Sequence, residues 1–200
     1  MKKVMPLLVL GAVVASASAS VQANDNWYVG VDVLNSDLEV EGISSDDSVT
    51  GLGIVLGSEV QYSENFKLAL EAEYVSYGSF EKKESSMGDW VKVSIDGYAF
   101  NLNAKPKYQF SESGFYIGAL AGLGVIGVDF EVASNILDAN GKTDGSDVGF
   151  NYGAEVGYEF DSGVIVSGGY RASSVTIDVE GGGELDFDFD SVYVGVDYKF

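Results

Sequence analysis

Residues 187–200 have the sequence FDFDSVYVGVDYKF, and this stretch decides the fold class. One alternate set of its residues is apolar, while the other is polar or small and carries charges close to the end of the chain. Such alternation has the two-residue period of a β-strand whose two faces meet different environments. The apolar set is Val192, Val194, Val196, Tyr198 and Phe200, and the other set is Ser191, Tyr193, Gly195, Asp197 and Lys199.

Seven further segments have strand character, and the connections between strands alternate between long and short. Strands are predicted over residues 27–38, 49–61, 66–80, 90–110, 115–130, 147–160, 164–179 and 187–200. The long connections are residues 39–48, 81–89, 131–146 and 180–186, and the short ones are residues 62–65, 111–114 and 161–163. The short connections have turn composition, so the pattern predicts four up-and-down hairpins.

The composition of the thinner strand face separates a soluble sandwich from a membrane barrel. In residues 147–160 the polar alternates are mostly glycine and carboxylate residues. A sandwich must bury one face against a second sheet, and this face has too little apolar volume to do so. We therefore expect an all-β fold, an eight-stranded antiparallel up-and-down transmembrane β-barrel with its apolar face toward lipid.

Aromatic residues near the strand ends predict two interfacial girdles. The predicted periplasmic girdle is Tyr62, Phe66, Tyr108, Phe110, Phe115, Phe160, Tyr198 and Phe200. The predicted outer girdle is Tyr74, Tyr77, Phe80, Trp90, Phe130 and Phe150.

Two strands change the phase of their apolar residues. The fourth does so near Asp96 and Gly97, where we predict a glycine bulge, and the seventh shows a similar change between Ala172 and Val175. Pro106 also falls in the fourth strand, where it removes a ladder hydrogen bond close to the short-turn end.

The first 23 residues predict a signal peptide. Lys2 and Lys3 precede an apolar run over residues 4–15, and residues 21–23 form an acceptable small-x-small cleavage site. The apolar run is shorter than the roughly 20 residues that a transmembrane helix needs. We expect cleavage near Ala23 and one barrel domain over residues 24–200.

Composition and charge narrow the function classes. The chain has 11 Lys and Arg against 31 Asp and Glu, a net charge of −20, which argues against a nucleic-acid partner. Its 46% hydrophobic residues and 2 prolines favour an ordered protein over a disordered acidic one. It has no histidine and no cysteine, which excludes Ser-His-Asp and Cys-His catalysis, imidazole and thiolate metal sites, and disulfides. We expect no catalytic residue and no cofactor.

Assigning the polar set inward places seven acids and five bases in the lumen. The interior of eight strands is just wide enough for side chains to fill, so these charges must pair with one another. The favoured interpretation is an ion-pair network that fills the barrel, and the alternative is a gated path for protons or small ions. The residues are Asp32, Glu59, Glu71, Glu73, Glu155, Glu159, Asp197, Lys67, Lys105, Lys107, Arg171 and Lys199.

The long connections and their flanks are strongly acidic. Residues 37–47, 81–89, 129–147 and 178–190 carry 19 acids against three lysines, which predicts a negative extracellular rim. This charge either keeps barrels soluble and apart, or binds divalent cations in the loops or between the loops and lipopolysaccharide phosphates. A calcium-binding candidate is Asp138, Asn140 and Asp144, in a loop that departs from the EF-hand pattern at Lys142 and Thr143.

With its predicted signal peptide, alternating strands, long and short connections and Tyr198-Lys199-Phe200 end, the chain resembles the small outer-membrane β-barrel family of OmpA and OmpX type along essentially its whole length. The resemblance implies location in the cell outer membrane and contact with its lipid and lipopolysaccharide. It also implies that the barrel-assembly machinery recognises Tyr198 and Phe200.

The function expected from these features is that of a non-enzymatic integral outer-membrane protein, structural or surface-interacting, with acidic extracellular loops. Two alternatives stay open: a narrow pore for small solutes or ions, and an adhesin or surface receptor that acts through the loops.

Overall fold

The computed structural model describes residues 26–40, 43–44, 48–86, 89–110, 113–135, 141–179 and 183–200. The regular elements of this part are β1 (Trp27–Val40), β2 (Ile43–Ser44), β3 (Val49–Gln61), β4 (Phe66–Ser86), β5 (Asp89–Gln109), β6 (Phe115–Ser134), β7 (Gly141–Glu159), β8 (Val164–Val179) and β9 (Gly183–Lys199). No helix among the described residues is long and apolar enough to span a membrane.

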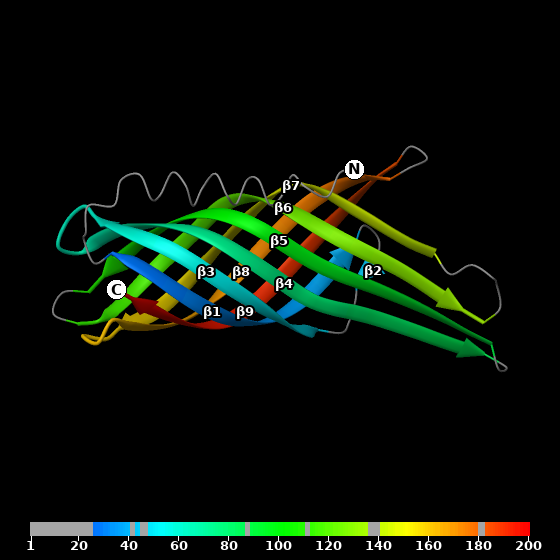
Figure 1. Cartoon of the computed structure of the whole chain (residues 1–200), viewed down its shortest axis with the longest axis horizontal. Helices are drawn as coiled ribbons and strands as arrows, with labels where there is room; N and C mark the ends of the chain where they lie inside the picture. The colour runs from blue at the N-terminus through cyan, green and yellow to red at the C-terminus, as the bar shows by residue number, and fades with distance from the viewer. Residues whose placement is uncertain are drawn as a thin grey trace.

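Eight of the strands form a closed antiparallel barrel, as the sequence predicts. The order around the ring is β1-β3-β4-β5-β6-β7-β8-β9, and β9 pairs back with β1, where Val196 lies opposite Val31. The strand β2 pairs with the end of β1. Figure 1 shows the strands crossing the long axis at a slant, with β1 and β9 side by side. The predicted fold class is therefore confirmed.

Several strands extend further from the short turns than the sequence predicts. The strand β4 continues to Ser86, β5 begins at Asp89, and β7 begins at Gly141. Much of the segments 81–89 and 131–146, which we expected to be loops, is therefore paired strand. In Figure 1, β4 to β7 reach well beyond the other strands.

A band of exposed apolar side chains surrounds the part of the barrel between the short turns and the level of Val192. Val192, Val194 and Val196 point outward, and all eight residues of the predicted periplasmic girdle are exposed. Of the predicted outer girdle, Tyr74 and Phe150 are exposed. Trp90 and Phe130 are half-buried. Tyr77 and Phe80 are buried in the barrel interior, so placing them in that girdle was wrong.

A bulge in β4 explains why both Tyr77 and Phe80 point inward. The register between β4 and β5 shifts between Ser76 and Gly78, which leaves Tyr77 as the extra residue. Gly78 has a φ of 99°, a conformation that favours glycine. The bulge lies opposite Gly97 of β5, whereas β5 itself keeps a continuous register there. The bulge that we predicted in β5 is therefore in the neighbouring strand.

The apparent phase change in β8 has a different cause. The strand pairs with β9 without interruption from Val164 to Val179, so it has no bulge between Ala172 and Val175. Its inward positions are polar at Ser173 but apolar at Val175, while the outward positions beyond them carry hydroxyl and carboxylate groups. The alternation of inward and outward positions is therefore unbroken. Beyond Ser173 the outward face becomes polar and the inward face becomes apolar.

The same exchange occurs in β9. Its outward residues change from Val192 to Asp190 and Asp188, and its inward residues from Ser191 to Phe189. The barrel beyond this level is organised like a water-soluble protein, polar outside and apolar inside. We call it the extension; it comprises residues 35–40, 77–86, 89–97, 126–134, 141–149, 174–179 and 183–191.

Apolar side chains fill the interior within and just below the extension. Tyr77 and Phe189 stack at its centre with ring centroids 4.3 Å apart. We call this group the apolar cluster. Its buried members are Leu34, Leu38, Val75, Tyr77, Phe80, Ala99, Ile126, Val128, Val175, Ile177, Phe187, Phe189 and Tyr193.

Pro106 interrupts one ladder and not the other. It lies opposite Leu68 in the β4–β5 pairing, but the β5–β6 pairing passes from Ala104 to Lys107 without it. A residue that lacks an N–H cannot donate to the second neighbour. The break lies close to the short-turn end, as predicted.

An arginine in place of Val196 is expected to destabilise the barrel. Val196 is outward-facing, about halfway along the apolar row of β9 and between Val31 and Val166. A cation there would lie in hydrocarbon at a cost of about 2–4 kcal/mol. Urea titration of the protein folded into lipid vesicles measures this loss. Thr176→Arg, on the outward face of the extension, is the matched control, and equal losses for both variants would contradict the assignment of the band.

Candidate functional site

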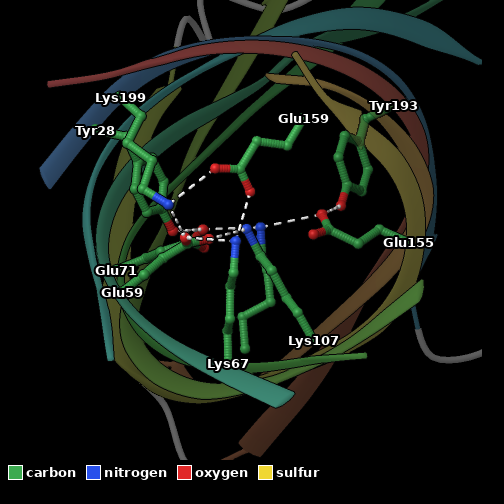
Figure 2. A network of polar contacts seen from close by, with 10 residues as sticks. Tyr28, Glu59, Lys67, Glu71, Lys107, Glu155, Glu159, Tyr193 and Lys199 are labelled. Carbon is green, nitrogen blue, oxygen red and sulfur yellow. Dashed lines mark hydrogen bonds and ion pairs between the residues drawn. The ribbon is translucent and has the colours of Figure 1, made fainter. Parts of the chain in front are cut away.

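The interior below the apolar cluster holds a network of charged side chains, which begins at the short-turn mouth of the barrel. Glu59 and Glu159 each accept contacts from more than one lysine. Lys199 Nζ lies 2.6 Å from Glu59 Oε2 and 2.9 Å from Glu159 Oε1. Lys67 Nζ lies 2.7 Å from Glu159 Oε2, and Lys107 Nζ lies 2.9 Å from Glu59 Oε1. Three lysines from three strands are thus linked by two glutamates (Figure 2).

One step deeper, a single lysine connects two glutamates. Lys105 Nζ lies 2.8 Å from Glu71 Oε1 and 3.0 Å from Glu155 Oε2. Two tyrosine hydroxyls donate to the same carboxylates, Tyr28 to Glu71 and Tyr193 to Glu155 at 2.7 Å. Figure 2 shows Tyr193 and Glu155 meeting on one wall, with Tyr28 and Glu71 on the opposite side. On each glutamate the tyrosine and Lys105 contact the same oxygen, Glu71 Oε1 and Glu155 Oε2, while the second oxygen of each carboxylate is buried without a hydrogen-bond partner among the described residues.

The deepest charged group is Arg171, which is almost completely buried. Its Nη1 forms an ion pair with Glu73 Oε1, and its Nη2 lies 3.7 Å from Asp32 Oδ2. Asn101 and Asn103 donate to the other oxygen of Glu73, at 3.2 and 3.0 Å. The charge of Arg171 is therefore balanced by carboxylates from two other strands, Glu73 of β4 and Asp32 of β1.

Two glycines make room for carboxylates on the seam where the barrel closes between β1 and β9. A Cβ at Gly195 would lie 2.3 Å from Asp32 Oδ1, and one at Gly30 would lie 1.7 Å from Asp197 Oδ1. A Cβ at either position would displace the carboxylate opposite it, so the glycines let the two aspartates take these inward positions. Among the described residues, no ion pair within 4.0 Å joins Asp197 to a base.

Above Arg171 the contents of the lumen become neutral. Tyr77 donates to Ser173 Oγ at 2.8 Å, and the hydroxyls of Ser36 and Ser191 lie 2.8 Å apart. The apolar cluster follows directly. The interior thus has two consecutive fillings, a charged one toward the short turns and an apolar one in the extension.

All twelve charged residues that the sequence predicted for the lumen lie inside the barrel, eleven of them in ion pairs with one another. Sequence reasoning missed the tyrosines and asparagines among them. Tyr28, Tyr193, Asn101, Asn103 and Asn151 all occupy inward positions. Their alternation with outward valine, alanine, phenylalanine and leucine residues was the available signal. It also missed the apolar cluster.

The other predicted residues lie elsewhere. Tyr198 and Phe200 are exposed at the end of the barrel, and the Phe200 N–H donates to the Trp27 carbonyl at 2.8 Å. Asp138 and Asn140 of the calcium candidate lie outside the described residues, as does the predicted signal peptide. Asp144 is exposed on β7, opposite Asp129. In the described part of the chain, no three acidic, histidine or cysteine side chains are grouped to hold a metal ion.

Comparison with known proteins gives one family and many similar structures. The model of the family described as outer membrane protein beta-barrel domain matches residues 5–200. Neisserial surface protein A is 16% identical with a TM-score of 0.53, over 87% of this chain and 97% of that one. The attachment invasion locus protein Ail of Yersinia pestis is 13% identical with a TM-score of 0.52, over 88% and 100%. No curated protein matches the chain.

Proposed function

Because the chain belongs to the outer-membrane β-barrel family, we propose that it is a non-enzymatic, non-conducting protein of that membrane which acts through its extracellular extension. The proposal rests on the contents of the lumen, which is filled by the charged network toward the short turns and by the apolar cluster in the extension. An ion must displace the charged network and then pass Phe189, Tyr77 and the rest of the apolar cluster. An unsolvated ion in such surroundings is very unfavourable.

The electrostatics of the charged network also support a structural role. Six of its seven carboxylates, Glu155 and Glu159 among them, are held in ion pairs with lysine or arginine, which opposes their use as a general acid and base. Paired charges of this kind fix the contacts between opposite walls of the barrel. The narrow-pore alternative requires that they separate.

Planar-bilayer recording of the refolded protein tests the proposal. We expect no steady single-channel steps above the baseline, for the protein and for the surface variant Lys92→Gln alike. Heat-modifiable migration on a gel verifies that the sample is folded. Steady steps that change in size with Glu155→Gln but not with Lys92→Gln would establish the narrow pore instead.

An adhesin or receptor role is the second candidate, and the length of the extension favours it. The strands β4 to β7 carry a sheet well past the apolar band, which a merely structural barrel does not need. Its outer face displays Asp96, Asp129 and Glu131. Shortening the β4–β5 hairpin is expected to leave the barrel folded and to reduce binding to host cells. Unchanged binding after this deletion would contradict the role.

A further inference from the structure

The charged network contains more carboxylates than bases, and the excess lies in its deeper part. Its twelve residues are seven acids and five bases. At the short-turn mouth, three lysines contact two glutamates. Deeper in the lumen, Lys105 and Arg171 face five carboxylates. Buried negative charge without a counter-charge is very unfavourable, so this part of the lumen needs further positive charge. The five carboxylates are those of Asp32, Glu71, Glu73, Glu155 and Asp197.

Two of these carboxylates lie at the seam where the barrel closes, Asp32 on β1 and Asp197 on β9. Asp32 Oδ2 is 3.7 Å from Arg171 Nη2, and Asp32 Oδ1 lies over Gly195, the residue opposite Asp32 on β9. Asp197 Oδ1 in turn lies over Gly30, the residue opposite Asp197 on β1. Within the described residues, Asp197 has no ion pair with a base. Two like charges are thus diagonal neighbours across one strand pair, which is unfavourable unless a cation lies between them.

A hydroxyl group from a third strand lies beside the same glycine. The Cβ position of Gly195 is 2.3 Å from Asp32 Oδ1 and 2.9 Å from Ser167 Oγ of β8, so these two oxygens are at most 5.2 Å apart, the sum of the two distances. Asp32, Ser167 and Asp197 are 4%, 7% and 9% exposed. All three point inward, so the surface that they retain faces the lumen. Oxygen atoms from β1, β8 and β9 therefore line a part of the lumen that protein atoms do not fill completely.

The donor atoms and their spacing suit a hard divalent cation. Carboxylate and hydroxyl oxygens are ligands for Ca²⁺, which binds them at about 2.3–2.6 Å and accepts water in its remaining positions. Oxygens up to about 5.2 Å apart can therefore share one Ca²⁺ ion. Only two of the protein ligands are acidic, which is compatible with the absence of three grouped acidic side chains in the described part of the chain. The two positive charges of the ion would offset most of the excess negative charge in the deeper lumen.

We propose that Asp32, Ser167 and Asp197 bind one divalent cation of the size of Ca²⁺ at the seam where the barrel closes. Asp32 is on the first strand and Asp197 is on the last, so the ligands come together only when β1 pairs with β9. An ion that binds the closed barrel and not the unfolded chain stabilises the closed form by mass action. The proposal goes beyond the proposed function and does not depend on it, because bilayer recording tests conduction separately.

The test is urea unfolding of the protein in phosphatidylcholine vesicles, which carry no net charge, at a series of free Ca²⁺ concentrations. Raising free Ca²⁺ to about 100 times its dissociation constant should lower the equilibrium constant for unfolding about 100-fold. Each further tenfold rise should lower the constant about tenfold, which is the slope for one bound ion. Equilibrium dialysis against radioactive calcium measures the number of ions directly, and about one tightly bound ion per folded protein is expected.

Three variants distinguish the lumen site from calcium on the acidic surface. Asp197→Asn should abolish the calcium response, yet in calcium-free buffer it should unfold no more readily than the unchanged protein, because it removes an unpaired buried charge. Ser167→Ala should weaken calcium binding roughly tenfold without changing the charge. Asp186→Asn is the matched control, since Asp186 is an exposed acid on the same strand, and it should change calcium binding by less than about twofold.

Three results would overturn the proposal. One is a stability that does not respond to Ca²⁺, and another is an equal loss of calcium binding in Asp197→Asn and Asp186→Asn, which would place the ion on the surface. The third is a stability that falls as the pH rises in calcium-free buffer, is made independent of pH by Asp197→Asn, and does not respond to Ca²⁺. That result would show that a proton, and not a metal ion, offsets the charge at the seam.

Discussion

Replacing Arg171 with methionine is expected to lower the free energy of unfolding by about 3–5 kcal/mol, because it leaves buried carboxylates without their cation. Glu73 loses its ion pair and Asp32 its nearest positive charge. Methionine has a similar volume and no charge, so the loss reports charge more than volume. Urea unfolding in lipid vesicles, followed by tryptophan fluorescence and by heat-modifiable migration, measures it.

Two variants separate this effect from general damage. Glu73→Gln in the Arg171→Met background is expected to recover about 1–3 kcal/mol, since it removes the carboxylate that was left alone. Lys92→Met breaks an exposed ion pair with Glu81 and should cost less than about 1 kcal/mol. A loss for Arg171→Met no larger than that for Lys92→Met would show that the network contributes little to stability.

Replacing Phe189 with alanine is expected to cost about 3–5 kcal/mol, although the residue lies above the apolar band. Phe189 is fully buried, stacks on Tyr77, and packs against Phe80 with ring centroids 6.3 Å apart. Removing it empties the centre of the apolar cluster. The same unfolding titration detects the change.

Leu185→Ala is the matched control for Phe189→Ala. Leu185 is on the same strand and face but is 37% exposed, so its truncation should cost less than about 1.5 kcal/mol. If both variants lose the same small amount of stability, the extension is not held by an apolar core. Hydrogen exchange adds a local measure, with faster exchange in β4 and β9 expected for the alanine variant at 189.

The closed barrel and its membrane-facing band could be predicted from the sequence because both depend on local alternation. Val192 to Phe200 show the pattern in full, and the short turns define the hairpins. The extension could not be predicted this way. Alternation identifies which residues share a face, but it does not say whether the outer face meets lipid or water.

The exchange of polarity between the inner and outer faces was therefore interpreted as a phase change in β8 and as a loop before β9. Glu184 and Asp186 were assigned to a loop, whereas they are outward residues of a paired strand. The bulge in β4 has a similar origin. Its signal in the sequence is Tyr77-Gly78, and the phase change that we noticed in β5 reflects inward Ile95 and outward Tyr98 on either side of the boundary.

The charged lumen residues could be predicted because an ionised side chain on the inward face of a membrane barrel has no alternative location. Their partners could not be predicted, since pairing depends on the stagger of strands distant in the sequence, such as Lys105 with Glu71 and Glu155. Tyr28 and Tyr193 were ambiguous. An aromatic ring with a hydroxyl group suits an interfacial girdle as well as a carboxylate in the lumen.

We expect the outward face of β9 to pass from lipid to water between Val192 and Asp190. Because the chain has no cysteine, single cysteines at the outward positions of residues 184–198 can each carry a spin label. Collisional accessibility in lipid vesicles should favour oxygen from Val192 to Tyr198 and a water-soluble nickel reagent from Asp190 to Glu184. An oxygen-favouring environment that continues to Asp186, or a label at Val194 that favours nickel, would contradict the account.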